Sequence, residues 1–557
     1  MQNKIIPLLI YFSLCPFILT QAQDEHIGTL MKKYNHYRER LENEYVLVSP
    51  DVEMYGTNIP AVDRLRNQKG YKHLSWSDGN SNFHDYIILL VTEIELLKRN
   101  DQPYKKSLTA LVYAMLAIER LDLYSEYNLR LYHDKKMLHK GDSINQYIKY
   151  PADINGFMIR DDVSFGFWMS NHRHFGFDLG KPDEKLTRTT KYQSIFQEGT
   201  IPLQGMSQDV IIHLLEALTV MDHFMDKEFA GDIPVNFQND LIPEYLNTKG
   251  IWFKDVIDFK AWARDLSLRL INNIQQNEKQ AAVVYKPWYK MGKITNIEFL
   301  KLLSTRWYIM NPVTEKPVRE GSGTDMGVLI NAHGFARTVE NITGARDLHF
   351  EHSDRGFLRW LFRTVYYKEL KLPLGAAIAL PRNWDDNKTR SLASFGNVHG
   401  SHSPVFFSLR EIGMKHRYRY YILTNYLLNQ DKLNSLYHPG TAMWKEDSTW
   451  FADVLKLAPP DGPFSDTTRD HYTVYWSTSS RLVWPQDAPT WRGGTQFEYA
   501  GMDYMALHNL YRLVYCDEHY FLDYKPVRKE LELAKKTGQL DDQINEKVFL
   551  HAPVVQD

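Results

Sequence analysis

Cysteine is almost absent from this chain, which has 2 cysteines in 557 residues. Neither sign of charge dominates, since 66 Lys and Arg stand against 68 Asp and Glu and the net charge is −2. The scarcity of thiols excludes a disulfide framework, and the charge balance argues against a protein that coats nucleic acid. Aromatic residues are plentiful instead, with 13 Trp, 34 Tyr and 27 Phe, and the chain also has 21 His. We therefore expect a folded protein rich in stacking and titratable rings.

The first 22 residues have the pattern of a secretory signal peptide. Lys4 supplies the positive charge, and the apolar stretch from Ile5 to Leu19 is shorter than the roughly 20 residues that span a membrane. Small residues end this stretch, so we expect cleavage near Ala22, which leaves Cys516 as the only thiol. Export without disulfides favours the bacterial periplasm, and no later apolar run is long enough to cross a membrane.

Apolar residues recur at helical spacing in the segments 87–97, 108–115, 211–218 and 504–514. Alternation typical of a strand is scarce, and Tyr472 to Trp476 is the best example. Successive helix pairs must stack to bury their apolar faces, so the sequence predicts a mainly α fold. We expect an α/α toroid, a closed ring of helix hairpins with long aromatic-rich loops. It would form one domain over 23–557, with a charged peripheral helix from about residue 525.

One polar segment begins at Arg160, Asp161 and Asp162 and ends at Asn171 and His172. An amide donor beside a titratable ring suits substrate recognition and proton transfer. A solvated polar loop is the alternative interpretation.

Gln208 and Asp209 directly precede the helical segment that starts at Val210, so we expect both in its first turn. A carboxylate there complements the helix dipole, which by itself explains Asp209. Gln208 would point toward the mouth of a toroid.

Two segments share the pattern Asn-x-His-Gly. Asn331 and His333 fall on an expected helix, where they face different directions, so at most one of them lines a cavity. Asn397 and His399 fall in a glycine-flanked loop with His402 close behind, and these side chains can converge. We expect this second loop to belong to the catalytic centre, with His399 as the base.

Arg469 and Tyr472 lie beside three tryptophans, Trp476, Trp484 and Trp491. A tyrosine near an arginine can transfer a proton, and indole rings can stack on sugars. A Trp-rich packing loop would produce the same pattern.

Motifs of several other enzyme classes are missing, including the Gly-x-Ser-x-Gly elbow, the P-loop, Gly-x-Gly-x-x-Gly and His-Glu-x-x-His. His349, Glu351 and His352 have a spacing that suits a metal, but they are isolated in the sequence. We expect neither a metal nor an organic cofactor.

The leader, the helical layout, the Asn171-His172 pair and the His-Gly loops resemble secreted uronate-acting lyases and dehydratases. These enzymes belong to polysaccharide-utilisation systems of Bacteroidota and include alginate-lyase-like enzymes and ulvan oligosaccharide dehydratases. The resemblance implies that an Asn and a His hold the uronate carboxylate and that a Tyr or His moves the proton. The chain differs from that family because no Tyr follows His172 at the usual interval and no C-terminal β-sandwich is recognisable. The second difference points to a compact enzyme that acts on oligosaccharides.

Three functions remain open at this stage. The first is β-elimination on a uronate residue of an oligosaccharide, with catalytic candidates His399, His402, Asn397, His172 and Tyr472. Its candidates for substrate binding are Asn171, Arg160, Gln208, Asn331, His333 and Arg469. The second is a glycoside hydrolase, which needs two carboxylates about 5 to 10 Å apart, such as Asp161 or Asp162 with Asp209. The third is a non-catalytic sugar-binding protein. We expect an acidic oligosaccharide as the partner, and neither nucleic acid nor a membrane.

Overall fold

The computed structural model describes the chain in segments, and within them the protein is mainly helical with short strands. This confirms the prediction of a mainly α fold. The described residues are 30–51, 58–61, 63–67, 70–76, 79–125, 154–163, 165–177, 187–189, 208–237, 240–276, 307–309, 335–336, 338–346, 348, 440–457, 464–466, 473–475 and 496–516.

Long helices form where the sequence has the helical period. All four predicted segments are confirmed, in α2 (Gly79–Arg99), α3 (Lys105–Leu123), α6 (Gln208–Phe224) and α19 (Met502–Tyr515). The structure adds α5 (Phe165–Asn171), α7 (Leu241–Thr248), α8 (Phe259–Asn272) and α18 (Ala442–Leu457). Residues 30–40 are also helical and continue into the π-helix η1 (Leu41–Tyr45).

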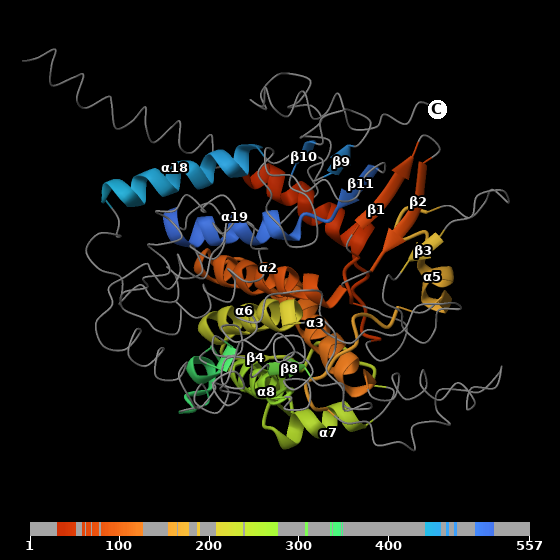
Figure 1. Ribbon diagram of the computed structural model, residues 1–557, viewed down its shortest axis with the longest axis vertical. Coiled ribbons are helices and arrows are strands. Elements are labelled where there is room, and N and C mark those ends of the chain that lie inside the picture. Colours follow the sequence, from red (N-terminus) through yellow and green to blue (C-terminus); the bar gives the residue numbers. More distant parts are fainter. Residues whose placement is uncertain are drawn as a thin grey trace, which may run out of the picture.

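The helices pack side by side in a row (Figure 1). Helix α18 packs on α19, α19 on α2, α2 on α6, and α6 on α8, while α3 lies against α2 and α7. The row therefore places the C-terminal helix α19 next to α2, from the first fifth of the chain. None of the helices in the described segments is both long and apolar enough to cross a membrane.

The core of the row is apolar, as the spacing of its residues predicts. Ile87 and Leu90 of α2, Leu111 of α3 and Leu214 of α6 are all fully buried. Burial of one such side chain contributes about 1.5 to 3 kcal/mol, so the shared apolar faces of these helices stabilise the row.

A buried polar group also crosses this core, centred on Glu93 of α2. Its carboxylate accepts hydrogen bonds from Arg38 Nε at 2.8 Å, from Ser107 Oγ at 2.6 Å and from the Tyr34 hydroxyl. Burial alone would raise the pKa of Glu93, but Arg38 and these donors hold it below its usual range. Asn509 of α19 donates to Tyr34 Oη at 3.3 Å, so the group links the N-terminal helix to α19.

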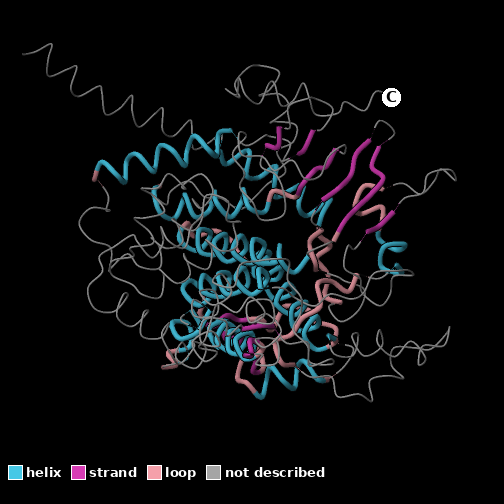
Figure 2. Tube along the Cα trace, in the orientation of Figure 1, coloured by secondary structure: helices cyan, strands magenta, loops and turns pink. Residues whose placement is uncertain are grey.

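A sheet at one end of the row joins distant parts of the chain (Figure 2). Its order is β10 (Thr473–Tyr475), β9 (Phe464–Asp466), β11 (Gln496–Tyr499), β1 (Asp63–Asn67), β2 (Gly70–Ser75) and β3 (Thr187–Thr189). Neighbours are antiparallel except for the parallel pair β2 and β3. Strand β10 lies within the predicted strand at 472–476, whereas the hairpin of β1 and β2 was not predicted.

Two smaller sheets lie near α8. One has the order β4 (Lys227–Phe229), β6 (Val256–Asp258) and β5 (Trp252–Phe253), and all its pairs are antiparallel. The other pairs β7 (Ile274–Gln276) with β8 (Trp307–Ile309). Strand β6 of the first sheet leads directly into α8. Asp258, its last residue, caps that helix, because its side chain accepts a hydrogen bond from Ala261 N at 2.9 Å.

Candidate active site

His172 lies directly after α5, in a tight turn. Its main-chain N–H donates to Trp168 O at 2.8 Å, and its carbonyl accepts from Phe177 N at 3.0 Å. Gly176 has φ +77°, a conformation that glycine adopts without steric cost, and this brings Phe177 back toward α5. The turn therefore fixes the His172 backbone on both sides.

The His172 ring is held in one tautomer by the main chain. Nδ1 lies 2.9 Å from Met169 O, and a carbonyl oxygen can only accept, so Nδ1 carries a proton and donates it. In the neutral ring the lone pair is then on Nε2. This atom is buried and has no hydrogen-bond partner among the residues that the structure describes. An unpaired buried polar atom costs about 1 to 3 kcal/mol, which marks Nε2 as a candidate for a functional role.

Aromatic rings surround this turn. The Trp168 ring meets the imidazole of His172 edge-on, with centroids 6.3 Å apart. Phe177 packs on Trp168 at 5.0 Å, and Trp76 meets the Phe175 ring at 5.5 Å in a near-perpendicular arrangement. This aromatic wall holds the imidazole in one orientation beside α5.

The neighbouring polar side chains of the turn bind main-chain carbonyls. Asn171 Nδ2 donates to Phe167 O at 2.9 Å, one helical turn back, and His174 Nε2 lies 3.0 Å from Val46 O. The structure thus places Asn171 beside His172, with one amide hydrogen used to end α5.

The segment that precedes α5 contains the predicted acidic residues. Asp162 forms a bidentate ion pair with Arg120 of α3, at 2.5 Å from Nε and 3.0 Å from Nη2. Asp161 is buried and its Oδ1 accepts from Val163 N at 3.2 Å. Arg160 is buried as well. Arg120 thus balances the charge of the Asp162 carboxylate within the fold.

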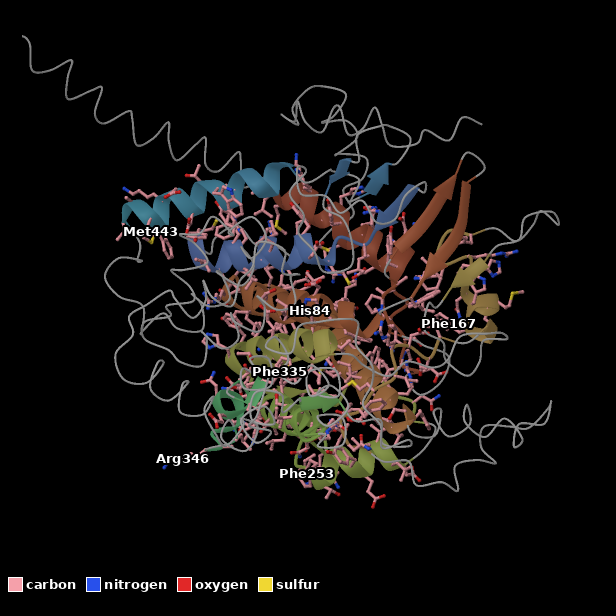
Figure 3. The ribbon with its side chains drawn as sticks, viewed as in Figure 1. His84, Phe167, Phe253, Phe335, Arg346 and Met443 are labelled. Carbon is pink, nitrogen blue, oxygen red and sulfur yellow. The ribbon has the colours of Figure 1, made fainter. Side chains whose placement is uncertain are left out.

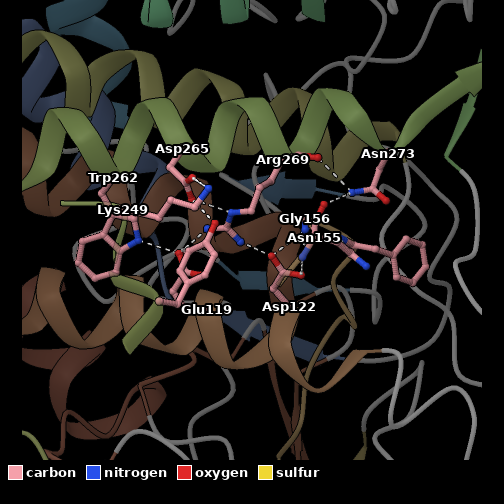
Figure 4. Close-up of polar contacts among 11 residues, drawn as sticks. Glu119, Asp122, Asn155, Gly156, Lys249, Trp262, Asp265, Arg269 and Asn273 are labelled. Carbon is pink, nitrogen blue, oxygen red and sulfur yellow. Dashed lines mark hydrogen bonds and ion pairs between the residues drawn. The ribbon is translucent and has the colours of Figure 1, made fainter. Parts of the chain in front are cut away.

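A second buried ionic group holds this segment in place (Figure 4). Arg269 of α8 pairs with Asp122 through Nη1 and with Glu119 through Nη2, the latter at 2.6 Å. Both carboxylates are fully buried, and burial raises the pKa of Asp122 to about 7 although Arg269 opposes the shift. We call Glu119, Asp122 and Arg269 the arginine cluster.

The arginine cluster fixes the start of the segment 154–163. Asp122 accepts hydrogen bonds from Asn155 N at 3.1 Å and from Gly156 N at 2.9 Å, and Asn273 Nδ2 donates to Asn155 O at 2.6 Å. No motif in the sequence predicted this cluster. The available signal was the acidic pair of Glu119 and Asp122, which follows the largely apolar stretch 108–118 of the same helix.

Gln208 and Asp209 are the first two residues of α6, in the first turn where the sequence predicts them. The remaining predicted site residues lie outside the described residues: Asn331, His333, His349, Glu351, His352, Asn397, His399, His402, Arg469 and Tyr472. The leader and the tail from about residue 525 lie outside them as well. Within the described segments, no group of three or more His, Cys, Asp or Glu is placed to hold a metal.

No family model, no curated protein and no solved structure matches this chain.

Proposed function

We propose that this protein is an exported carbohydrate-active enzyme that catalyses β-elimination on a uronic acid residue of an oligosaccharide. The reaction class is that of a lyase or a dehydratase, and an ulvan-type oligosaccharide is a substrate of the right chemistry. One observation carries the proposal: His172 has its Nδ1 committed to Met169 O and its buried Nε2 without a hydrogen-bond partner among the described residues.

The chemistry requires a positioned group that exchanges a proton. A base removes the C5 proton of the uronate, the C4–C5 double bond forms, and the C4–O bond breaks as its oxygen takes up a proton from an acid. A histidine can serve as base or acid, and such groups contribute about 10²- to 10⁴-fold. His172 would exchange its proton through Nε2 in either role, because Nδ1 keeps its bond to Met169 O.

The other proposed participants are residues that the sequence pattern singles out. The loop of Asn397, His399 and His402 would bind the uronate carboxylate and remove the C5 proton, and Tyr472 is an alternative acid to His172. The helix row is compatible with part of an α/α toroid, and the proposal includes that closed architecture, a single domain over 23–557 and a periplasmic location.

The environment of the acidic residues weighs against a glycoside hydrolase. Such an enzyme needs one carboxyl group that can donate a proton and another that acts as base or nucleophile. Asp162 is bound at both oxygens by Arg120, and Asp161 is buried with a bond to Val163 N. The Asp162 carboxylate of one proposed pair with Asp209 is therefore committed to Arg120.

The test is to incubate the purified protein with uronate oligosaccharides and follow the ultraviolet absorbance of the conjugated double bond. We expect the wild-type protein to produce this signal and His172→Gln to lower the rate by about 10²-fold or more. His174→Gln is the matched control, since it lies in the same turn but binds Val46 O. It should keep most of the activity.

Two results would refute the proposal. One is full activity of His172→Gln with a circular dichroism spectrum like that of the wild type. The other is the release of saturated products with new reducing ends, which indicates hydrolysis.

A further inference from the structure

The sheet of β4, β6 and β5 has one solvent-exposed apolar face. Phe229, Val256 and Phe253 lie directly opposite one another on the three strands, and their exposed fractions are 61%, 40% and 58%. We call these three residues the aromatic row; Figure 3 places Phe253 at the periphery of the molecule. Ile257 points to the opposite face and is fully buried, so the alternation of the sheet itself directs the row outward. The largest exposed apolar patch of a folded protein is often a functional surface.

The backbone beneath the aromatic row is held firmly. The turn between β5 and β6 places Lys254 at φ +55°, a left-handed conformation that residues other than glycine adopt only where the surrounding contacts hold them in it. Trp252 Nε1 donates to Lys254 O at 3.0 Å, and Ala230 N donates to Asp255 O at 2.7 Å. A ligand would therefore meet a preformed surface and lose little affinity to ordering it.

Charged groups flank the aromatic row. Lys105 Nζ lies 5.9 Å from the ring centre of Phe229 and is ion-paired with Asp232, whereas Lys254 Nζ lies 5.3 Å from the ring centre of Phe253. Lys227 and Asp258 form the next cross-strand pair on the same face of the sheet, and their charged groups lie 3.6 Å apart. The surface thus combines an apolar centre with ammonium groups over both rings.

The size of the row decides what can cover it. From the exposed fractions, the three side chains present roughly 300 Å² to solvent. A stable interface between two proteins buries about 800 Å² on each partner, so the row is too small to hold a second copy of this chain. It fits a short ligand with one flat apolar face and polar or anionic groups at its edge. A pyranose ring has such a face, and a uronate adds a carboxylate that an ammonium group can bind.

We propose that the aromatic row, with Lys254, is a binding platform for a short acidic oligosaccharide. The aromatic row lies on β4, β6 and β5 and not in the turn after α5, so a ligand can bind to it whether or not His172 is catalytic. It would hold the same class of saccharide that the enzyme is proposed to cleave.

The test is a calorimetric titration of the full-length protein with oligogalacturonate and, separately, with oligoalginate. The double variant Phe229→Ala and Phe253→Ala should bind about tenfold or more weakly, because it removes both flat apolar faces on which a pyranose ring can stack. Leu268→Ala is the matched control, since Leu268 is an exposed apolar residue of α8 outside the row, and it should bind as the wild type does. Lys254→Gln should weaken binding of the acidic probes more than binding of a neutral cello-oligosaccharide.

Three outcomes would overturn this proposal. The wild-type protein binds neither acidic probe, or the double variant binds them as well as the control does, or the wild type is a dimer that the double variant dissociates. Loss of binding in the double variant with unchanged turnover of a short substrate would support the platform. If no substrate is turned over but the titration still distinguishes the variants, the proposed function fails while the platform stands.

Discussion

Arg269→Met tests how the arginine cluster stabilises the fold. Methionine keeps most of the apolar stem of Arg269 but removes its charge, so Glu119 and Asp122 become buried carboxylates without a cation. Both side chains have 0% exposure, and Arg269 is 7% exposed as their partner. Removing one partner of a buried ion pair costs about 3 to 5 kcal/mol. A typical domain has only about 5 to 15 kcal/mol of stability, so the loss should be large.

The assay is urea unfolding followed by tryptophan fluorescence, with the free energy of unfolding taken from the midpoint and slope. Arg99→Met is the matched control, because Arg99 binds Glu95 at 2.6 Å on the surface of α2 with side chains 33% and 19% exposed. A surface pair spaced in this way contributes about 0.3 to 0.5 kcal/mol. We therefore expect Arg269→Met to be destabilised several times more than Arg99→Met.

A triple variant checks the cause. Glu119→Gln and Asp122→Asn added to Arg269→Met remove the unpaired charges, and replacement of a whole buried ionic group by neutral residues is often close to neutral in stability. The triple variant should regain much of the lost stability. Equal stability of Arg269→Met and Arg99→Met would refute the reasoning, and so would a triple variant less stable than Arg269→Met alone.

Two further predictions concern buried positions. Burial lowers the pKa of His508 to about 3, whereas the unfolded chain titrates near 6.5, so this group makes stability fall as the pH drops from 6.5 toward 3. His508→Phe should flatten that pH dependence in urea unfolding, and an unchanged slope would contradict the assignment. Gly156 has φ +88° and an added Cβ would lie 2.4 Å from a main-chain atom of α8, whereas Gly250 has φ +68° with open space around it. Gly250→Ala should therefore lose only the about 1 to 2 kcal/mol of stability that a left-handed backbone conformation costs an alanine. Gly156→Ala should lose clearly more, which thermal melting of the two variants would show. Similar melting temperatures for the two variants would refute the packing at Gly156.

Local patterns predicted the helices well and the sheets poorly. Helix α2 was predicted because Ile87, Leu90 and Ile94 repeat at its period, and that repeat is buried against its neighbours. Strand β1 reads Asp-Arg-Leu-Arg-Asn, with a single apolar residue, so its sequence shows no alternation. Its partner β11 lies near the other end of the chain, and no local window contains both strands.

The sequence pattern singled out residues of the candidate site but not the contacts that they make. The sequence singled out Asn171 and His172 as neighbours, and the structure places them at the end of α5. The bond from His172 to Met169 O depends on main-chain geometry, which no side-chain pattern reveals. Asp162 looked available as a catalytic acid because its partner, Arg120, lies on a different element.

The pairing of the two ends of the chain constrains when the protein can fold. The bond between Asn509 and Tyr34 spans 475 residues, and strand β1 hydrogen-bonds to β11. Closing a flexible loop of that length costs about 5 kcal/mol of chain entropy before any contact compensates for it. Such non-local pairing makes folding slow, and a ribosome must release residues 496–516 before the six-stranded sheet can form. The emerging chain therefore lacks its complete native sheet until strand β11 has been made.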